Sequence, residues 1–295
     1  MTDAASRPRE AHLYGLALLV QLIWALNNSI SKLVVVHFPG VLLAGLRYAL
    51  GLAIMLPIYW WRRPHRWEWR DVPRLLVLGA VGLGLNQLFF VIGIKLTSVT
   101  HAALIIPLTP MITLALSSAM AHERFTTGKI VGMLIAFSGV VVLQLSKGAG
   151  EGATVLGDFF ILLGIISFAI YIVFGKGFSK QFDSVLVNTF ALIGSMIVTA
   201  PVAGWQAFGF DFSKVPISAW AGLFYMTAFS SILGYLIYYY VLTHMAPSRI
   251  STFSYVQPVL TSGIATMLVG EPITVPLVIS GLLVLAGVYF AERSQ

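Results

Sequence analysis

The side chains able to bind a small molecule are few, and they lie inside long apolar runs at helical spacing. The first run carries Gln21, Trp24, Asn28 and Lys32, three or four residues apart, with Asn27 beside them. Residues at this spacing share one face of a helix. Indole and amide groups on one face suit a ligand that is part apolar and part hydrogen-bonding. Two alternatives stay open: hydrogen bonds between helices for the asparagines, and an interfacial position for Lys32.

Polar and aromatic residues in other runs complete the candidate cavity. They are Asn86, Gln87, Thr109, Tyr171, Tyr235, Tyr239, Ser254 and Gln257. With Trp24 they would form a ring of tyrosine, tryptophan and amide side chains that accepts ligands of different size. For the tyrosines at 238–240, close to the end of their run, an interfacial aromatic belt competes with a position in the cavity.

Two prolines follow polar residues of this set. Pro110 comes directly after Thr109, and Pro258 comes directly after Gln257. A proline inside a helix removes one backbone hydrogen bond and obstructs the carbonyl one turn earlier. The sequence therefore predicts that each helix bends there and offers a freed carbonyl to a ligand or to water. We favour a hinge over a static kink because both halves of the chain carry the proline.

The elements that position these residues are ten apolar runs of roughly 18 to 25 residues, the length with which a helix crosses a bilayer. Of the 295 residues, 58% are hydrophobic and 10% are charged, whereas soluble domains have about 25% charged residues. The chain is therefore predicted to be an integral membrane protein. The predicted helices cover about 13–36, 41–61, 73–94, 101–121, 128–146, 155–177, 184–205, 217–241, 250–270 and 274–292.

The distribution of lysine and arginine predicts the orientation. Most of these residues fall on the side of the predicted helices that also holds both termini, including the segment RRPHRWEWR at 62–70. Basic residues concentrate in cytoplasmic loops, so both termini are predicted to be cytoplasmic, with the chain in the inner (plasma) membrane. The net charge of +7 then reflects orientation, and no nucleic-acid partner is predicted.

The chain is an internal duplication with an offset of 148 residues. The segments 103–144 and 251–292 have identical residues at several matching positions, in the same order: Pro110/Pro258, Glu123/Glu271, Thr126/Thr274 and Gly139/Gly287. We predict two domains, residues 1–148 and 149–295, with five helices each. Because five is an odd number, the second copy enters the membrane from the opposite side. Inverted repeats of this kind are typical of secondary transporters.

The sequence lacks a catalytic or metal-binding constellation. It has no cysteine, and no HExxH motif, serine–histidine pair or aspartate pair at membrane depth. All 11 acidic residues lie in loops or at predicted helix ends, so a mid-membrane carboxylate proton relay is not expected. His101 is the one histidine with a claim to that role. We predict no enzyme, no cofactor and no metal site, and we expect Glu123 and Glu271 to anchor short connections rather than to bind substrate.

These motifs resemble the EamA-type transporters of the drug/metabolite transporter superfamily. The resemblance rests on the paired signatures that run from Pro110 to Gly139 and from Pro258 to Gly287, on LIWALNNSISKL in the first helix and on Leu46-Arg47-Tyr48 in the second. It covers essentially the whole chain and is closest to the aromatic amino acid exporter (YddG-type) branch. It implies ten transmembrane helices as two inverted five-helix repeats, with a cavity lined by the first, third, fourth, sixth, eighth and ninth helices.

We therefore expect an all-α integral membrane protein that exports amino acids, aromatic and other neutral ones, from the cytoplasm by alternating access. The substrate class rests mainly on the resemblance. The alternatives are export of another small metabolite or drug, and a lipid-carrier flippase, for which Lys32 and Arg47 are the candidate headgroup ligands. The glycine-rich helices at 128–146 and 274–292 would serve in packing or in contact with a second copy in a homodimer.

Overall fold

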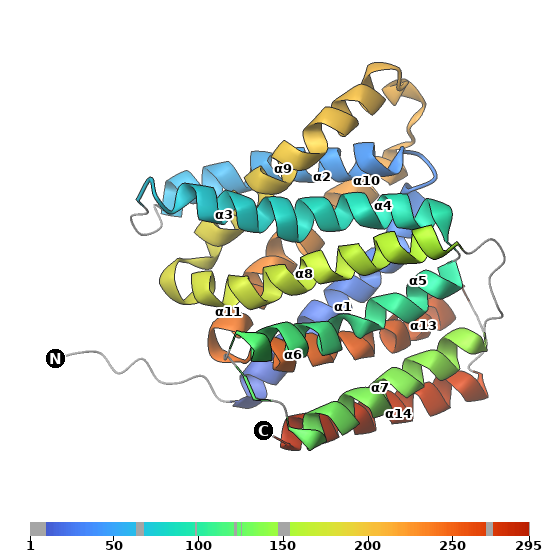
Figure 1. The fold of residues 1–295 in the computed structure, drawn as a ribbon. Helices are drawn as coiled ribbons and strands as arrows, with labels where there is room; N and C mark the ends of the chain where they lie inside the picture. The colour runs from blue at the N-terminus through green and yellow to red at the C-terminus, as the bar shows by residue number, and fades with distance from the viewer. Residues whose placement is uncertain are drawn as a thin grey trace.

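The computed structural model describes residues 10–62, 68–97, 99–120, 123–124, 126–146, 154–269 and 274–294. All the regular secondary structure in these ranges is helical. The helices lie side by side, and α1 begins at the end of the bundle where α14 ends (Figure 1). Within the described ranges nine helical stretches are long and apolar enough to cross a membrane. The one predicted crossing that is not among these nine, at about 250–270, consists of three shorter consecutive helical segments.

Both halves of the chain have the same order of elements. The first half contains α1 (Glu10–Val34), α2 (Gly40–Arg62), α3 (Val72–Gly79) with η1 (Ala80–Leu85) and α4 (Asn86–Leu96), α5 (Val99–Ile105) with η2 (Ile106–Leu108) and α6 (Thr109–Ala119), and α7 (Thr127–Leu145). The second half contains α8 (Val155–Gln181), α9 (Ser184–Phe208), η3 (Phe212–Lys214), α10 (Ile217–Tyr225) with η4 (Met226–Gly234) and α11 (Tyr235–His244), α12 (Pro247–Thr252) with η5 (Phe253–Tyr255) and α13 (Val256–Val269), and α14 (Val275–Arg293).

The two halves share their irregularities as well as their helices. The third crossing of each half contains a π-helical segment, η1 or η4, and the fourth contains a 3₁₀ segment, η2 or η5. The packing is also paired: α1 packs on α13 and α11, as α8 packs on α6 and α4. The segment η1 packs on α9, as η4 packs on α2. The fold is therefore a pair of inverted five-helix repeats.

The start of the last helix in each repeat follows from a matched threonine. Thr126 and Thr274 have extended backbones and accept a hydrogen bond from the backbone N–H three residues later, on Lys129 at 3.3 Å and on Leu277 at 3.4 Å. A side-chain oxygen in this position satisfies one of the free N–H groups at a helix start. The repeated threonine thus fixes where α7 and α14 begin.

The helices α7 and α14 lie against each other along their glycine faces (Figure 1). A Cβ atom on Gly132 would stand 2.4 Å from the backbone nitrogen of Ala291, and one on Gly287 would stand 2.3 Å from that of Ala136. Only glycine permits this separation between the two backbones. The opposite faces carry exposed residues such as Leu134 and Leu282. The expected packing role is therefore met inside one chain, and the homodimer through these helices stays a prediction.

Candidate functional site

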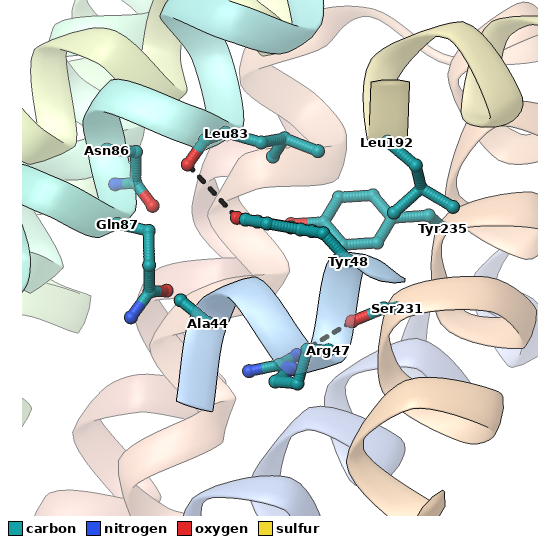
Figure 2. Close-up of a pocket in the computed structure, with 9 residues that line it drawn as sticks. All are labelled: Ala44, Arg47, Tyr48, Leu83, Asn86, Gln87, Leu192, Ser231 and Tyr235. Atoms are coloured by element: carbon teal, nitrogen blue, oxygen red, sulfur yellow. Dashed lines mark hydrogen bonds between the residues drawn. The ribbon is translucent and has the colours of Figure 1, made fainter. Parts of the chain in front are cut away.

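A polar cavity lies between α2, η1, α4, α9, η4 and α11, and we call it the Arg47 cavity (Figure 2). Its volume is about 50 Å³, and it is lined by Ala44, Arg47, Tyr48, Leu83, Asn86, Gln87, Leu192, Ser231 and Tyr235. Arg47 and Ser231 face Asn86 and Gln87 across this space (Figure 2). Each repeat contributes its π-helical segment to the wall, through Leu83 of η1 and Ser231 of η4.

A second, smaller cavity lies between α1, α6, α8, α11 and α12, and we call it the Gln21 cavity. Its volume is about 20 Å³, and it is lined by Gln21, Trp24, Thr109, Phe168, Ile172, Tyr238, Ile250, Ser251 and Ser254. The side-chain oxygens of Gln21 and Tyr238 are buried without a hydrogen-bond partner among the described residues. Buried polar atoms are normally paired with protein or water. These two oxygens therefore mark a surface suited to water or a ligand.

The two cavities lie at different depths in the membrane. The face where α1 begins and α14 ends is called the terminal face here, and the face where α1 ends and α2 begins is called the far face. Arg47 is seven residues into α2, about 10 Å from the far face at 1.5 Å per residue. Ile250 and Ser251 lie near the start of α12, close to the terminal face. Both cavities also include residues near the middle of their helices, so the Arg47 cavity is central and lies nearer the far face than the Gln21 cavity does.

An aromatic layer separates the two cavities. The Trp24 ring lies 5.4 Å from the Tyr235 ring and 5.5 Å from the Tyr238 ring, measured between centroids. Tyr171 packs behind them, 5.9 Å from Tyr235 and 5.6 Å from Tyr239. Tyr235 lines the Arg47 cavity, whereas Trp24 and Tyr238 line the Gln21 cavity. The contact between Trp24 and Tyr235 is therefore the barrier between the two spaces.

The π-helical segment η4 holds this arrangement together by accepting side chains from three helices. The Trp24 Nε1 atom donates to the Ser230 carbonyl at 3.3 Å. Arg47 Nη2 donates to the Ser231 hydroxyl at 2.8 Å, and Asn188 Nδ2 donates to the Ser231 carbonyl at 3.4 Å. A π-helical turn shifts its backbone hydrogen bonds to the fifth residue along and often occurs at functional sites. Here it presents backbone oxygens to α1, α2 and α9 at the centre of the fold.

Polar clusters join the helices at the terminal face. Arg249 forms an ion pair with Glu292 at 2.5 Å and stands 4.0 Å from Glu10, while the Tyr14 hydroxyl donates to Glu292 at 3.0 Å. These contacts link α12, α14 and α1. A second cluster centres on Glu123, which pairs with Lys129 Nζ at 3.2 Å and accepts the Ser248 N–H at 2.9 Å. The Glu123 carboxylate thus anchors the connection before α7 and also the start of α12 in the other repeat.

A smaller cluster joins the helices at the far face. Asp158 Oδ2 lies 2.9 Å from His101 Nδ1, and the Thr97 hydroxyl donates to Asp158 Oδ1. These residues link α8 to α5 and to the end of α4.

Ligand sites for small molecules usually enclose about 300–1,000 Å³, and both cavities are far smaller. In this structure neither cavity has room for a whole amino acid.

The chain matches the EamA-like transporter family twice, over residues 13–145 and 155–292. It belongs to the EamA-like transporter family. An uncharacterized transporter of Archaeoglobus fulgidus is 29% identical over 94% of this chain and 97% of its own. A Salmonella typhimurium protein named a probable amino-acid metabolite efflux pump is 27% identical over 93% of this chain and 92% of its own. A solved structure titled "Crystal structure of protein" shares the fold, with a TM-score of 0.79, 21% identity and 98% coverage of both chains.

The family assignment confirms the predicted resemblance and fold class. The protein is an integral membrane transporter of the drug/metabolite transporter superfamily, with a small-molecule substrate and the bilayer as its surroundings. The relatives named in these comparisons are transporters. The two matched segments correspond to the two five-helix repeats of this transporter.

Six of the predicted site residues line the cavities. Asn86, Gln87 and Tyr235 line the Arg47 cavity, and Trp24, Thr109 and Ser254 line the Gln21 cavity. Tyr171 and Tyr239 are fully buried in the aromatic layer behind them. Asn27, Asn28 and Gln257 line neither cavity, and Asn28 is exposed. The side chain of Lys32 lies outside the described residues, as does Glu271.

Of the polar residues in the Arg47 cavity, the sequence prediction named Arg47 only as a headgroup ligand in the flippase alternative, and it did not assign Tyr48 to the cavity. A signal for Arg47 was present, because it is a charged residue inside an apolar run, where charge is costly and usually functional. Tyr238 was left open between a belt and a cavity position. It is 2% exposed and lines the Gln21 cavity, so the belt interpretation fits only Tyr240, which is 41% exposed.

The predicted role of the prolines needs one correction. The chain breaks into 3₁₀ segments before both prolines, so Pro110 stands in the first turn of α6 and Pro258 near the start of α13. The carbonyl that Pro110 leaves without its helical partner is that of Ile106. The Thr109 hydroxyl donates to this oxygen at 2.6 Å. In this conformation the Ile106 carbonyl is therefore satisfied by its own chain rather than offered to a ligand.

Proposed function

We propose that this transporter exports amino acids from the cytoplasm by alternating access, as a non-enzymatic secondary carrier of the inner (plasma) membrane. The observation that carries the proposal is the pair of cavities at different depths, with the contact between Trp24 and Tyr235 standing between them. A substrate that passes this contact moves from one cavity to the other. Alternating access needs a site of this kind, near the middle of the membrane at the interface of two repeats.

The orientation of the transporter in the membrane rests on the basic residues. Arg62, Arg74, Lys180, Arg249 and Arg293 all lie at helix ends on the terminal face. The positive-inside rule makes that face cytoplasmic, and the same orientation places both termini in the cytoplasm. The Gln21 cavity then lies nearer the cytoplasm than the Arg47 cavity does, so in the proposed export the substrate enters by way of the Gln21 cavity.

The substrate class rests on the wall chemistry and on a relative. The walls combine rings, amides and hydroxyls, which suits an amino acid with an apolar or aromatic side chain. The Salmonella typhimurium relative is named a probable amino-acid metabolite efflux pump. Phenylalanine and other neutral amino acids are therefore the proposed cargo, with broad specificity.

Movement between states would separate the polar clusters at one face at a time. Opening at the terminal face separates α12 from α1 and α14, whereas opening at the far face separates α8 from α5. The 3₁₀ segments η2 and η5, with their prolines, lie on the crossings that contain α5 and α12, so these segments are the proposed hinges. The repeats at 1–148 and 149–295 supply one hinge each. No acidic side chain lines either cavity, which favours facilitated movement over proton coupling through a carboxylate.

The test is efflux from proteoliposomes that contain the purified full chain and are loaded with labelled phenylalanine, threonine or lysine. Each amino acid is measured with and without an imposed proton gradient, and protein-free liposomes give the leak. Efflux of phenylalanine and threonine above the leak without a gradient is the expected result. Efflux that occurs only with a proton gradient would mean that transport is coupled to protons and is not facilitated movement. No efflux of any of the three would overturn the amino acid assignment and favour another metabolite or a lipid-linked cargo.

A further inference from the structure

The positive charge of Arg47 has no negative partner in the described structure. Ion pairs within the described residues involve other side chains, and none includes Arg47. Its Nη2 atom donates to the Ser231 hydroxyl at 2.8 Å and to the Met226 carbonyl at 3.5 Å, both neutral acceptors. Its Nε atom is buried and has no hydrogen-bond partner. A charged group held at this depth is costly, and such groups normally mark a substrate or ion path.

The surroundings of Arg47 are polar but neutral. The ionisable groups that face it are the phenols of Tyr48 and Tyr235. Across the cavity lie the amides of Asn86 and Gln87 (Figure 2). The Asn86 amide donates to the Gly164 carbonyl at 2.9 Å, so its N–H₂ group is partly engaged by the fold. The site therefore offers a guanidinium and hydrogen-bonding groups, but no anion of its own.

The position of Arg47 is fixed by the packing of α2. A Cβ atom on Gly45 would stand 2.4 Å from the Cβ of Ala203, so α2 lies close against α9. The next residue after the arginine, Tyr48, donates to the Leu83 carbonyl at 3.3 Å and ties α2 to η1. These two contacts hold the helix in register on both sides. The guanidinium is thereby aimed into the cavity before any ligand arrives.

We propose that Arg47 binds the carboxylate of the exported amino acid, with Ser231 and Gln87 as neutral partners. This inference rests on the proposed function and names the recognition element of the same site. A planar guanidinium matches a carboxylate with two parallel hydrogen bonds, and the free Nε supplies one of the donors. A cavity of about 50 Å³ suits a group of carboxylate size and not a whole amino acid. The apolar side chain would therefore extend toward the aromatic layer as that layer opens.

The same geometry excludes the ammonium group of the substrate from this end of the site. Two positive charges in a low-dielectric space repel each other, so the ammonium must point toward the amides, the phenols or the free oxygens of the Gln21 cavity. Compounds that keep the carboxylate and lose the amine should then compete with phenylalanine. Compounds that keep the amine and lose the carboxylate should not.

The first arm of the test needs no variant. Efflux of labelled phenylalanine from wild-type proteoliposomes is measured against unlabelled 3-phenylpropanoate, phenethylamine and phenylalaninamide. We expect inhibition by 3-phenylpropanoate at a concentration roughly tenfold to a hundredfold lower than by the two amines, because a charge-assisted pair is lost with the amines. Equal inhibition by all three, or stronger inhibition by the amines, would overturn the carboxylate assignment.

The second arm compares Arg47→Gln and Arg47→Lys with Arg74→Gln, which removes an exposed arginine at the terminal face. Folding is followed by size-exclusion chromatography and thermal unfolding. We expect Arg74→Gln to leave phenylalanine efflux unchanged. Arg47→Gln should raise the half-saturating phenylalanine concentration at least tenfold. Arg47→Lys should give a half-saturating concentration between those of Arg47→Gln and the wild type. Folded Arg47→Gln with an unchanged half-saturating concentration would overturn the inference. If Arg47→Gln does not fold, the inhibitor series and Arg47→Lys decide. Absence of phenylalanine efflux in the wild type contradicts the proposed function itself, which keeps the two failures apart.

Discussion

Glu10 and Asp158 occupy equivalent positions in the two repeats, 148 residues apart, and each faces a basic residue that has its own counterpart at the same offset. Asp158 lies 2.9 Å from His101 at the far face, and Glu10 lies 4.0 Å from Arg249 at the terminal face. Each pair joins the first crossing of one repeat to the fourth crossing of the other repeat, α8 to α5 and α1 to α12. The duplicated pair therefore gives each face its own electrostatic contact.

Loss of the far-face pair should favour opening toward the outside. The substitution Asp158→Asn removes the charge that faces His101, and a partly exposed ion pair contributes about 1 kcal/mol or less, up to roughly fivefold in a population. The sequence has no cysteine, so a single Gln87→Cys reports access to the Arg47 cavity by maleimide labelling. We expect labelling from outside to rise about twofold to fivefold. Asp211→Asn is the control, because Asp211 pairs with Lys214 three residues later and joins no two crossings. Equal labelling in both variants would remove the far-face contact from the gating scheme.

Trp24 should be needed for transport through both its ring and its indole nitrogen. Trp24→Phe keeps a ring against Tyr235 and loses the hydrogen bond to Ser230, worth about 1 kcal/mol or roughly fivefold in rate. Trp24→Ala loses both and should reduce efflux further. The measurement is initial efflux of phenylalanine, normalised to folded protein. Trp61→Ala is the control, since Trp61 is 83% exposed. If Trp24→Ala stays folded and transports like the wild type, the barrier assigned to the aromatic layer is wrong.

The prolines should affect turnover more than binding. Pro258→Ala and Pro110→Ala restore a backbone N–H next to the 3₁₀ segments, which favours a continuous helix and stiffens the proposed hinges. We expect a lower maximal efflux rate with a nearly constant half-saturating concentration. Pro57→Ala in α2 and Pro201→Ala in α9 are the matched controls, because both prolines lie inside long helices without a 3₁₀ break. Unchanged turnover in Pro258→Ala would argue for a static kink.

Glycines at the closest helix contacts should be intolerant of a methyl group. A Cβ atom on Gly82 would stand 2.4 Å from the Cβ of Tyr171, so Gly82→Ala forces the π-helical segment away from the aromatic layer. Overpacking of this kind costs about 1–3 kcal/mol. Gly204→Ala has nothing within 4 Å and should be neutral or stabilising by up to about 1 kcal/mol. Thermal unfolding in detergent measures both, and equal midpoints would contradict the close contact.

The fold could be predicted from the sequence because its signals are local and repeated. A helix that crosses a bilayer must be apolar over its whole length, so ten apolar runs give ten crossings directly. The matched Thr126 and Thr274 fix helix starts through bonds to the third residue beyond. The odd number of helices in each copy then forces the inversion. None of these steps requires knowledge of which helix packs on which.

The candidate site was predicted in part for the same reason. Spacing along a helix determines which side chains share a face, and it put Gln21 and Trp24 on one face of the first helix; both line the Gln21 cavity. Spacing does not determine which neighbour that face meets. Asn28 shares the face of Trp24, yet it is exposed.

Only the tertiary structure decided the role of Arg47 and the shape of the centre. An isolated arginine in α2 has no periodic partner in the sequence, and its neighbours Ser231, Asn86 and Tyr235 come from helices far along the chain. The π-helical segments depend on backbone bonds to the fifth residue, for which η1 and η4 share no common motif. By itself the sequence determined a duplicated, inverted ten-helix transporter, because the apolar length of each crossing and the repeat can both be read from the order of the residues. The packing of α2, α4, α9 and η4 decided where a charge without a partner stands, because burial and pairing are properties of contacts between distant segments.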